Sequence, residues 1–353
     1  MVRAMQRIPI CLAAGCLLLA GCSGPSARVR RSPDEPLSDP EPYVRIENTD
    51  SNRVQLQIAA RQFLPGRRGQ PVIWLTGVAH IGESNYYAAL QAHLDAQTLV
   101  LFEGVGAAEA QTNSTVDAPS SIDANAAPVA NGGERESLQS TMASSLGLVF
   151  QLEAINYRRP SFQNSDLSIS QLRQLMAQAE TGSGRPGAGE SFESLLTLME
   201  GNSWFDSLLQ IALRFLGANP KLQAFGRLAL IDLLGQLQGD PSRLEGLPPE
   251  LKQLLEVLLQ KRNEKVISDL ESELPQIGRQ GSIAIFFGTG HMPDLERRLR
   301  SELKYRPGPE IWFTAFEVDL AKTKIAPSER AFIDDLVKWQ LKEAGAVPRV
   351  PKS

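Results

Sequence analysis

Short apolar runs and longer segments of helical period alternate along the chain. Continuous apolar runs at residues 72–76, 98–102 and 283–287 predict strands that are buried on both faces. Residues 54–58 alternate between aliphatic and glutamine side chains, which predicts a strand with one wet face. A last strand is expected at 311–318. Predicted strands therefore lie in both the N-terminal and the C-terminal parts of the chain.

A helix is predicted between the first two buried runs, from about Ser84 to Gln97, because its apolar residues recur at helical spacing. Its apolar face consists of Tyr86, Tyr87, Leu90 and Leu94. A strand, a helix and a second strand form a βαβ unit, whose two strands run parallel. We expect these two strands to lie side by side in the sheet.

The middle of the chain has helical period, at residues 137–156 and again at 192–274. Two stretches rich in small and polar residues, at 106–137 and 181–189, are expected to be flexible surface segments. Strands before and after a helical region predict an α/β fold. We expect a central, mostly parallel sheet with an inserted helical subdomain at about 137–274.

The N-terminus has the features of a bacterial lipoprotein. Two arginines precede an apolar run at residues 8–20, which is too short to span a bilayer as a stable helix and is typical of a signal peptide. The run ends in Leu-Ala-Gly-Cys22, which resembles a lipobox. We expect residues 1–21 to be removed and Cys22 to carry the lipid, with palmitate among its acyl chains. The alternative is an ordinary cleaved signal peptide with incidental cysteines.

The lipid would anchor the protein to a membrane of the cell envelope, facing the periplasm or the exterior. Residues 22–45 are rich in Ser, Pro, Asp, Glu and Arg, which predicts a solvated tether. The α/β domain is expected at residues 46–322, followed by a C-terminal helix and tail at 323–353.

Composition narrows the classes of function. The chain has 353 residues, of which 42% are hydrophobic and 22% charged, and these are globular values. The formal net charge is −4; without residues 1–21, which hold two basic residues and no acid, 34 basic and 40 acidic residues leave −6. No basic block stands out, which argues against nucleic acid as a partner. All three cysteines lie at or before Cys22, so a disulfide framework or a thiolate zinc site is not expected.

Two of the predicted strands end in the same way. The strand at 72–76 runs into Gly77 and then His80, and the strand at 283–287 runs into Gly288 and then His291. Each glycine would permit a sharp exit from its strand. Because functional groups collect at the carboxyl ends of parallel strands, these histidines are candidates for one shared site. The alternative is that each histidine is a hydrogen-bonded turn residue.

Glu103 stands at the end of the remaining buried strand, next along the chain from the first. Two imidazoles and a carboxylate have the composition of a metal site with open positions, of the kind that activates water. His93, the third histidine, lies within the predicted amphipathic helix and is expected to be a packing or surface residue.

These residues carry a resemblance to a known family. The two Gly-x-x-His motifs, the Phe-Glu103-Gly segment, Tyr86-Tyr87 and Arg262-Asn263 resemble the TraB/PrgY/GumN superfamily, over roughly residues 50–320 without the two polar stretches. That superfamily includes the Tiki metalloproteases and is related to the erythromycin-esterase/ChaN-like fold. Weaker similarity to its middle region lies at Gln151, Tyr157 and 162–166.

The resemblance implies a site built from His80, Glu103 and His291, with Arg262 nearby, and a divalent ion such as manganese, cobalt or zinc. The histidines would bind the ion as neutral imidazoles, and Glu103 would be a third ligand or the base that takes a proton from water. Arg262 would steady an oxyanion or a substrate carboxylate. Taken alone, its charged neighbourhood is equally typical of a solvated helix-face arginine.

Two further residues are possible members of the site. Asp166 either belongs to the site or caps a helix. Tyr86 is a possible ligand in an alternative function, because iron can be bound by histidine and tyrosine.

Three functions are therefore open. The first is a lipid-anchored, metal-dependent hydrolase that is peptidase-like and acts on a peptide or protein. The second is a haem- or iron-binding ChaN-like lipoprotein, with His80, His291, Tyr86 or Tyr87 as iron ligands. The third is a non-catalytic envelope factor that binds a secreted peptide.

Overall fold

The computed structural model describes residues 38–50, 52–104, 138–183, 217–236 and 254–343. The expected signal peptide, Cys22, all of the polar stretch at 106–137 and most of the one at 181–189 lie outside these residues. Within the described residues, no helix is both long and apolar enough to cross a bilayer.

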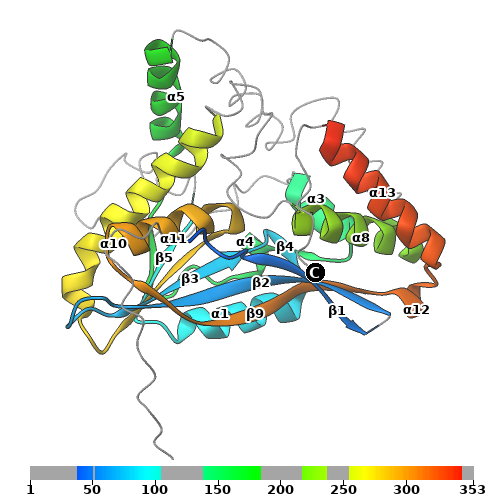
Figure 1. Cartoon of the computed structure of the whole chain (residues 1–353), viewed down its shortest axis with the longest axis horizontal. Helices are drawn as coiled ribbons and strands as arrows, with labels where there is room; N and C mark the ends of the chain where they lie inside the picture. Colours follow the sequence, from blue (N-terminus) through cyan, green and yellow to red (C-terminus); the bar gives the residue numbers. More distant parts are fainter. Residues whose placement is uncertain (1–37, 51, 105–137, 184–216, 237–253, 344–353) are drawn as a thin grey trace, which may run out of the picture. The chain divides into compact units, whose positions relative to one another are not determined.

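A seven-stranded mixed sheet forms the centre of the fold (Figure 1). The strands are β1 (Val44–Asp50), β2 (Arg53–Leu64), β3 (Val72–Val78), β5 (Leu99–Phe102), β7 (Phe162–Asn164), β8 (Ser282–Gly288) and β9 (Arg306–Asp319). β3, β8, β5 and β7 lie in that order and run parallel. β2 pairs antiparallel with β9 along one edge, and with β1 and then β3 along the other. The expected α/β class with a central, mostly parallel sheet is confirmed.

Helices cover the sheet and connect its strands. They are α1 (Ser84–Asp95), α3 (Leu138–Ser145), α4 (Gln151–Ala154), α5 (Ile169–Ser183), α8 (Pro220–Gln236), the π-helical turn η2 (Glu256–Lys261), α10 (Arg262–Ile277), the 3₁₀ turn η3 (Thr289–His291), α11 (Met292–Ser301), α12 (Leu320–Thr323) and α13 (Pro327–Glu343). A separate two-stranded ladder joins β4 (Ile81–Gly82) to β6 (Val149–Phe150).

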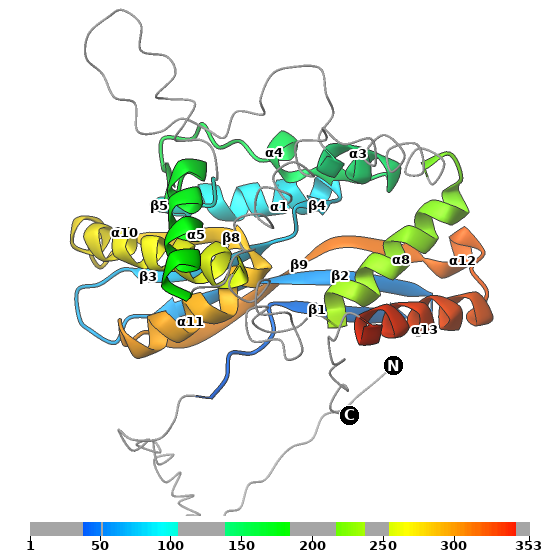
Figure 2. The ribbon, with the colours of Figure 1, turned by 90° about the horizontal axis from the view of Figure 1, so that it is seen from above.

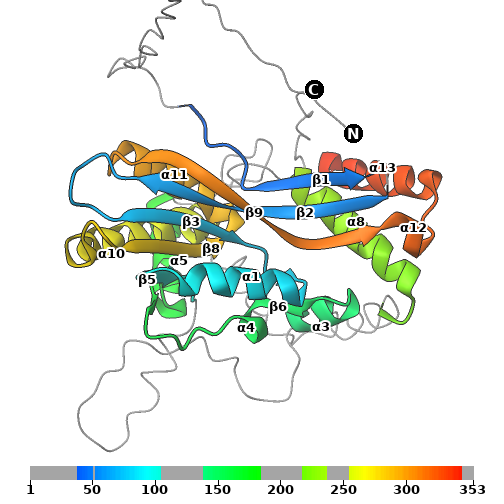
Figure 3. The ribbon, with the colours of Figure 1, turned by 90° about the horizontal axis from the view of Figure 1, so that it is seen from below.

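The parallel strands are buried between two helical layers, with α1 on one face and α10 and α11 on the other (Figures 2 and 3). Val100, Ala284 and Phe286 pack in one core with Leu90 and Leu94 of α1. On the opposite face, alternate residues of the same strands pack with α10 and α11, including Leu75, Leu101, Ile285, Leu270 and Leu295. Burial on both faces explains why these strands have no polar alternation in the sequence.

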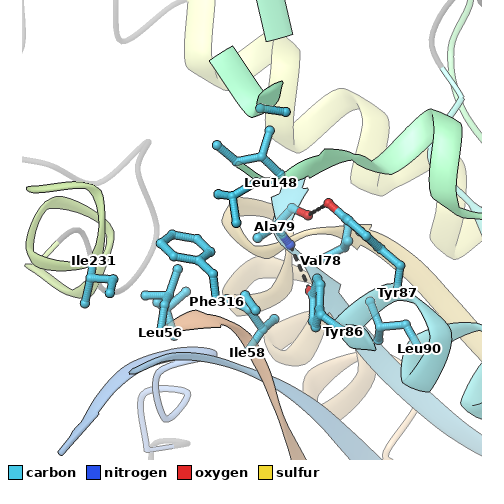
Figure 4. Packing of buried hydrophobic residues seen from close by; sticks show 14 of the residues in the cluster. Leu56, Ile58, Val78, Ala79, Tyr86, Tyr87, Leu90, Leu148, Ile231 and Phe316 are labelled. Atoms are coloured by element: carbon cyan, nitrogen blue, oxygen red, sulfur yellow. Dashed lines mark hydrogen bonds between the residues drawn. The ribbon is translucent and has the colours of Figure 1, made fainter. Parts of the chain in front are cut away.

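The antiparallel part of the sheet has a helical cover of its own. Leu56 and Ile58 of β2, Phe316 of β9 and Ile231 of α8 belong to one buried cluster (Figure 4). α13 adds buried side chains to this cluster, and it also contacts α8 directly. The alternation expected at residues 54–58 is confirmed, because the glutamines face the opposite side and are partly exposed.

One expectation about the strand order is wrong. The first two buried strands, β3 and β5, are parallel but do not pair, because β8 lies between them and pairs with both. A crossover helix of this length can skip one strand position, and the sequence pattern of the two strands is the same in either case. The consequence is functional, because the end of β8 comes to lie between the ends of β3 and β5.

The folded part begins before the boundary expected at residue 46. β1 starts at Val44, and Tyr43 is buried and donates its hydroxyl to Glu296 of α11 at 2.8 Å. Arg300 donates to the carbonyl oxygen of Ser38 at 2.9 Å. Residues 38–45, expected as the end of the tether, therefore pack against the domain.

The region expected as a helical insertion also contains strands. The helical period at 137–156 predicts one continuous segment, but α3 ends at Ser145, and Gly147 follows with a φ of 62°. That left-handed conformation favours glycine and ends the helix. β6 and β7 follow, and β7 is a member of the central sheet.

His93 packs on the sheet, as its place in the amphipathic helix predicts. Its ring meets Trp74 edge-on with a centroid distance of 4.9 Å, and Phe313 lies 5.7 Å away. Its Nε2 lies 3.2 Å from the hydroxyl of Thr76. Burial lowers the pKa of His93 to about 4, so the ring is neutral at pH 7.

We expect His93 to weaken the fold in acid. Between pH 6.5 and 4 the unfolded chain binds a proton at His93 that the folded protein does not, so stability falls as the pH falls. The share of His93 in this loss should reach about 3 kcal/mol at pH 4, and the pH dependence should be weaker by that amount in His93→Gln, as measured by urea unfolding across this range. An equal pH dependence in the two proteins would contradict the assignment.

Candidate functional site

The ends of all four parallel strands carry polar side chains that meet at one edge of the sheet. His80 follows β3, His291 follows β8, Glu103 follows β5 and Asp166 follows β7. Arg262, the first residue of α10, reaches the same place from outside the sheet. The structure therefore brings together the residues that the sequence singles out, at the strand ends where functional groups collect in parallel sheets.

Glu103 lies at the centre of this group. Its Oε2 accepts a hydrogen bond from the backbone N–H of Gly288 at 2.7 Å, and its Oε1 accepts one from Arg262 at 2.6 Å. The Nε2 of His291 lies 3.8 Å from the same Oε1. Burial opposes ionisation of Glu103, but the charge of Arg262 and the hydrogen bond from the backbone N–H of Gly288 hold its pKa well below its usual range. Glu103 is therefore a carboxylate at neutral pH.

Arg262 is buried and uses all of its N–H groups. Nε and Nη2 donate to the two oxygens of Asp166 at 2.8 and 2.7 Å, and Nη2 also donates to Glu103. Nη1 lies 3.3 Å from both the carbonyl oxygen of Leu258 and the Nε2 of His291. The interpretation as a solvated helix-face arginine is wrong. In this structure the contacts of Arg262 position its neighbours, and the expected role in steadying an oxyanion stays a prediction.

The helix that presents Arg262 has an unusual start. α10 continues directly from η2, a π-helical turn, and such turns occur frequently at functional sites. Burial disfavours the charge of Arg262, but Glu103 and Asp166 raise its pKa, so it stays protonated.

Asp166 is the second carboxylate of the site. Besides the two bonds from Arg262, it accepts hydrogen bonds from the backbone N–H groups of Gly104 and Leu167, at 3.0 and 2.7 Å. Its side chain is fully buried. Asp166 therefore links the ends of β5 and β7 to α10, and belongs to the site.

His80 is held through one ring nitrogen. Its Nδ1 lies 2.8 Å from the amide oxygen of Gln151. Since the amide nitrogen of Gln151 donates to the hydroxyl of Tyr157 at 2.7 Å, the oxygen faces His80 and accepts the Nδ1 proton. The other nitrogen, Nε2, is left with its lone pair. His80 is also the exposed member of the site.

His291 is held in the same way. Its Nδ1 lies 2.7 Å from the amide oxygen of Asn263, whose amide nitrogen donates to Asp294 at 3.0 Å. Its Nε2 is again the nitrogen with the lone pair, and it faces Arg262 and Glu103. Burial and the charge of Arg262 lower the pKa of His291 to about 4, so the ring is neutral at pH 7.

The motif glycines provide space rather than a sharp turn. Gly288 has an ordinary φ of −51°, so the expected need for glycine flexibility is wrong. A Cβ at Gly288 would lie 3.3 Å from both Oε2 of Glu103 and Nε2 of His80. A Cβ at Gly77 would lie 3.1 Å from Thr289. The glycines therefore let the ends of β3, β5 and β8 approach one another closely.

Tyr86 lies behind the site rather than in it. Its hydroxyl accepts a hydrogen bond from the backbone N–H of Ala79 at 3.1 Å, and Tyr87 donates to the carbonyl oxygen of Ala79 at 2.8 Å (Figure 4). Both rings are buried, and burial raises the pKa of each tyrosine. The pair fixes the peptide groups directly before His80, and neither hydroxyl points to a site for iron.

Two partners were not identified as such from the sequence: Asn263, which was noted only within the Arg262-Asn263 motif, and Asp294. Asn263 follows Arg262 and Asp294 stands three residues after His291, but no spacing rule shows which way either side chain points. Gln151 and Tyr157 had only a weak resemblance in their favour. The amide side chains that hold the two histidines can be identified only in the folded structure, because nothing in the local sequence marks them.

The donor atoms fit a divalent cation. Within the described residues, no three His, Cys, Asp or Glu side chains are spaced as a formed metal cluster, and Arg262 approaches His291 instead. Even so, two imidazole lone pairs and a carboxylate face one place, and an N–H partner fixed by an outer residue is usual for metal-binding histidines. Glu103, Asp166 and Arg262 carry a formal charge of −1 together, and His291 adds none because its ring is neutral at pH 7, which favours a cation.

Comparison with known proteins adds no assignment. No family model matches the chain, and no curated protein or solved structure matches it. The resemblance to the TraB/PrgY/GumN superfamily stays a prediction, carried by the motifs.

Removing Arg262 should cost much more stability than removing an exposed arginine. Arg262→Met leaves two buried carboxylates without their cation, and the free energy of unfolding should fall by about 3–5 kcal/mol. The matched control is Arg159→Met, which breaks the exposed pair with Asp95 and should cost about 0–1 kcal/mol. Urea unfolding at pH 7 measures both, and similar losses would mean that Arg262 does not hold the site together.

Proposed function

We propose that the chain is a lipid-anchored, metal-dependent hydrolase that acts on peptides or proteins at the cell envelope. The observation that carries the proposal is the matched support of the two histidines. In both Gly-x-x-His motifs an amide oxygen holds Nδ1. Nε2 of His291 then lies 3.8 Å from Glu103, and Nε2 of His80 borders the same space beside Gly288 as the Glu103 carboxylate. Histidines that act only as turn residues have no need of such an arrangement.

His80, His291 and Glu103 would hold the ion, which we take to be manganese, cobalt or zinc. A divalent ion supplies Lewis acidity, which polarises a carbonyl group and makes water a better nucleophile. The neutral imidazole of His291 and the ionised carboxylate of Glu103 are already in the protonation states that ligands need. Gln151 and Asn263 then act as orienting residues that keep each imidazole in the correct tautomer.

The environment of Glu103 favours the role of ligand over that of base. A general base works best with a pKa near the operating pH, and Arg262 holds the pKa of Glu103 well below its usual range. Arg262 keeps two bonds to Asp166 that do not involve His291. Its Nη1 can therefore give up Nε2 of His291 without losing the ion pair.

The two alternatives have less support. The iron-binding function would depend on His80 and His291 alone, because the hydroxyls of the other two candidate ligands, Tyr86 and Tyr87, both bind Ala79. A non-catalytic peptide-binding factor would use the same surface without a metal. Metal analysis separates these alternatives from the hydrolase.

The test is the metal content of the mature protein and its variants, measured by mass spectrometry after dialysis against a limiting divalent cation. His80→Ala and His291→Ala should each lose the bound ion, because a site of three protein ligands cannot spare one. Glu103→Gln should bind it weakly, since an amide is a poor ligand. Gln151→Ala removes only an orienting bond, and its affinity should fall by about 10–100-fold.

His93→Ala is the control, because it removes a histidine that lies away from the site. It should retain the ion at the level of the parent protein. If the His80 and His291 variants bind the ion as tightly as the parent, the hydrolase proposal fails. A metal-free parent that binds peptides would favour the non-catalytic factor.

The anchor is tested separately. Mass spectrometry of the mature N-terminus should show a diacylated or triacylated Cys22, because the lipobox-like Leu-Ala-Gly-Cys precedes it. Cys22→Ser should abolish the modification and release the protein from the membrane fraction. An unmodified N-terminus at another residue would remove the lipid from the proposal.

A further inference from the structure

Two surface segments place four positive charges together at one end of the sheet. The turn between β2 and β3 contains Arg67 and Arg68. The segment that joins α11 to β9 contains Lys304 and leads into Arg306, the first residue of β9. All four side chains belong to exposed residues. We call these four residues the basic patch.

Backbone contacts hold the two segments against each other. Leu64, the last residue of β2, pairs with Arg306 at the end of the ladder between β2 and β9. A Cβ at Gly66 would collide with the carbonyl oxygen of Lys304. The two segments lie at the same end of the sheet in Figures 1 and 3. The basic patch therefore combines parts of the chain that are far apart in sequence, so no basic block marks it there.

Acidic side chains do not neutralise the basic patch. The turn between β2 and β3 contains no acid, and the segment between α11 and β9 contains one, Glu302, which is paired with Arg298 at 3.6 Å. Glu310, further along β9, is paired with Arg61 at 3.0 Å. Among the described residues, none of the four basic side chains of the patch forms an ion pair. Their charges are therefore available to an anionic partner.

The net charge of this surface is positive even when its neighbours are counted. The described N-terminal segment, which packs on α11, adds two acidic residues, Asp39 and Glu41. Four basic and two acidic residues leave +2, whereas the whole chain carries −4. The patch thus differs in sign from the protein as a whole, and such a local field selects a partner of opposite charge.

We propose that the basic patch docks on the surface of a bilayer that contains anionic lipid. Exposed Arg and Lys side chains are attracted to a layer of anionic headgroups and need no shaped pocket for this. Leu64, which is 40% exposed, lies beside Arg306 and adds an apolar side chain for the headgroup region. A second copy of the chain fits less well, because it would bring two basic patches together.

The basic patch and the candidate site lie at opposite ends of the parallel strands. β3 begins directly after the turn that contains Arg67 and Arg68, and His80 follows its other end. A strand of seven residues spans about 20 Å. A bilayer in contact with the patch would therefore leave the site facing the solvent, where a soluble substrate could reach it. The docking itself does not depend on the metal site.

The first described residue lies on the same side of the domain as the patch. Arg300, in the last turn of α11, donates to the carbonyl oxygen of Ser38 at 2.9 Å, and Lys304 follows four residues later. Cys22 precedes Ser38 by 16 positions, and a chain of that length spans at most about 55 Å. A lipid on Cys22 would keep the patch within reach of the bilayer, so a weak attraction would act at high effective concentration.

The experiment measures the binding of the chain without its lipid to vesicles, by sedimentation. The protein used comprises residues 23–353, which retain the whole compact unit that begins at Ser38. We expect it to bind vesicles of phosphatidylcholine and phosphatidylglycerol much more tightly than vesicles of phosphatidylcholine alone. The affinity should fall as NaCl is added, because salt screens the attraction. Since this protein has no lipid, the result does not depend on the anchor.

Arg67→Gln with Arg68→Gln should weaken binding to the anionic vesicles roughly 25-fold, because each basic residue at such a surface contributes about a fivefold factor. Arg67→Lys with Arg68→Lys retains the charge and should bind like the parent. The matched control is Lys322→Gln with Lys324→Gln, which removes two exposed charges beyond the other end of β9 and should change the affinity little. Thermal unfolding of each variant should match the parent, since all of these side chains are exposed.

Three outcomes would overturn the proposal. The first is an equal affinity of the parent for the two kinds of vesicle. The second is that the glutamine variant of Arg67 and Arg68 binds the anionic vesicles as tightly as the parent. The third is an equal loss in the control variant of Lys322 and Lys324, which would show that only the total charge matters. The metal assay concerns other residues, so the two proposals fail independently.

Discussion

The site depends on one buried group of charges, Arg262 between Glu103 and Asp166. Moving three charges out of water is costly, and they stay buried because the positive charge attracts the two negative ones. The guanidinium is planar and its N–H groups point in fixed directions, so it sets the positions of both carboxylates. Through them it ties the ends of β5 and β7 to the start of α10. The arrangement thus fixes the geometry of the site and does not add a large gain in stability.

The strand order brings the two histidines next to these charged side chains. With β8 between β3 and β5, the end of one strand has a neighbour on each side, and His291 enters next to Glu103 while His80 approaches from the other side. Gly288 makes the approach possible because it has no Cβ in the shared space. Behind it, the two tyrosine hydroxyls fix the peptide groups before His80. Backbone position, ring tautomer and carboxylate charge are each controlled by a different set of contacts.

The sequence predicts those parts of the structure that produce a recognisable pattern of apolar and polar residues. β3, β5 and β8 are recognisable because strands buried on both faces have no polar alternation, and the repeated Gly-x-x-His marks two strand ends. Strand order is different, since the same apolar runs are compatible with β8 in the middle or at an edge. The α/β class follows from the order of elements, whereas the neighbours of each strand follow from long-range packing.

The direction in which a side chain points is the second feature that the sequence does not predict. Arg262 stands in a run of charged residues, and Lys261 and Glu264 of that run are indeed exposed, so composition indicates a solvated helix face. The π-helical turn η2, which the apolar period does not reveal, directly precedes Arg262, whose side chain turns inward. Tyr43 shows the same limit, because a polar and proline-rich segment looks unfolded although one buried aromatic side chain at its end packs on α11.

Each N–H group of Arg262 has a partner within the protein, and this bears on the order in which the chain would fold and bind an ion. A domain whose ligands must wait for their ion, as in small zinc modules, folds only when the ion arrives. Here the charged groups of the site already have partners within the protein: Glu103 and Asp166 have the guanidinium, and Nδ1 of each imidazole has an amide. Folding therefore does not have to wait for an ion. A protein of the kind proposed, exported unfolded and metal-dependent, would complete its structure first and acquire its ion afterwards, from whatever supply its compartment contains.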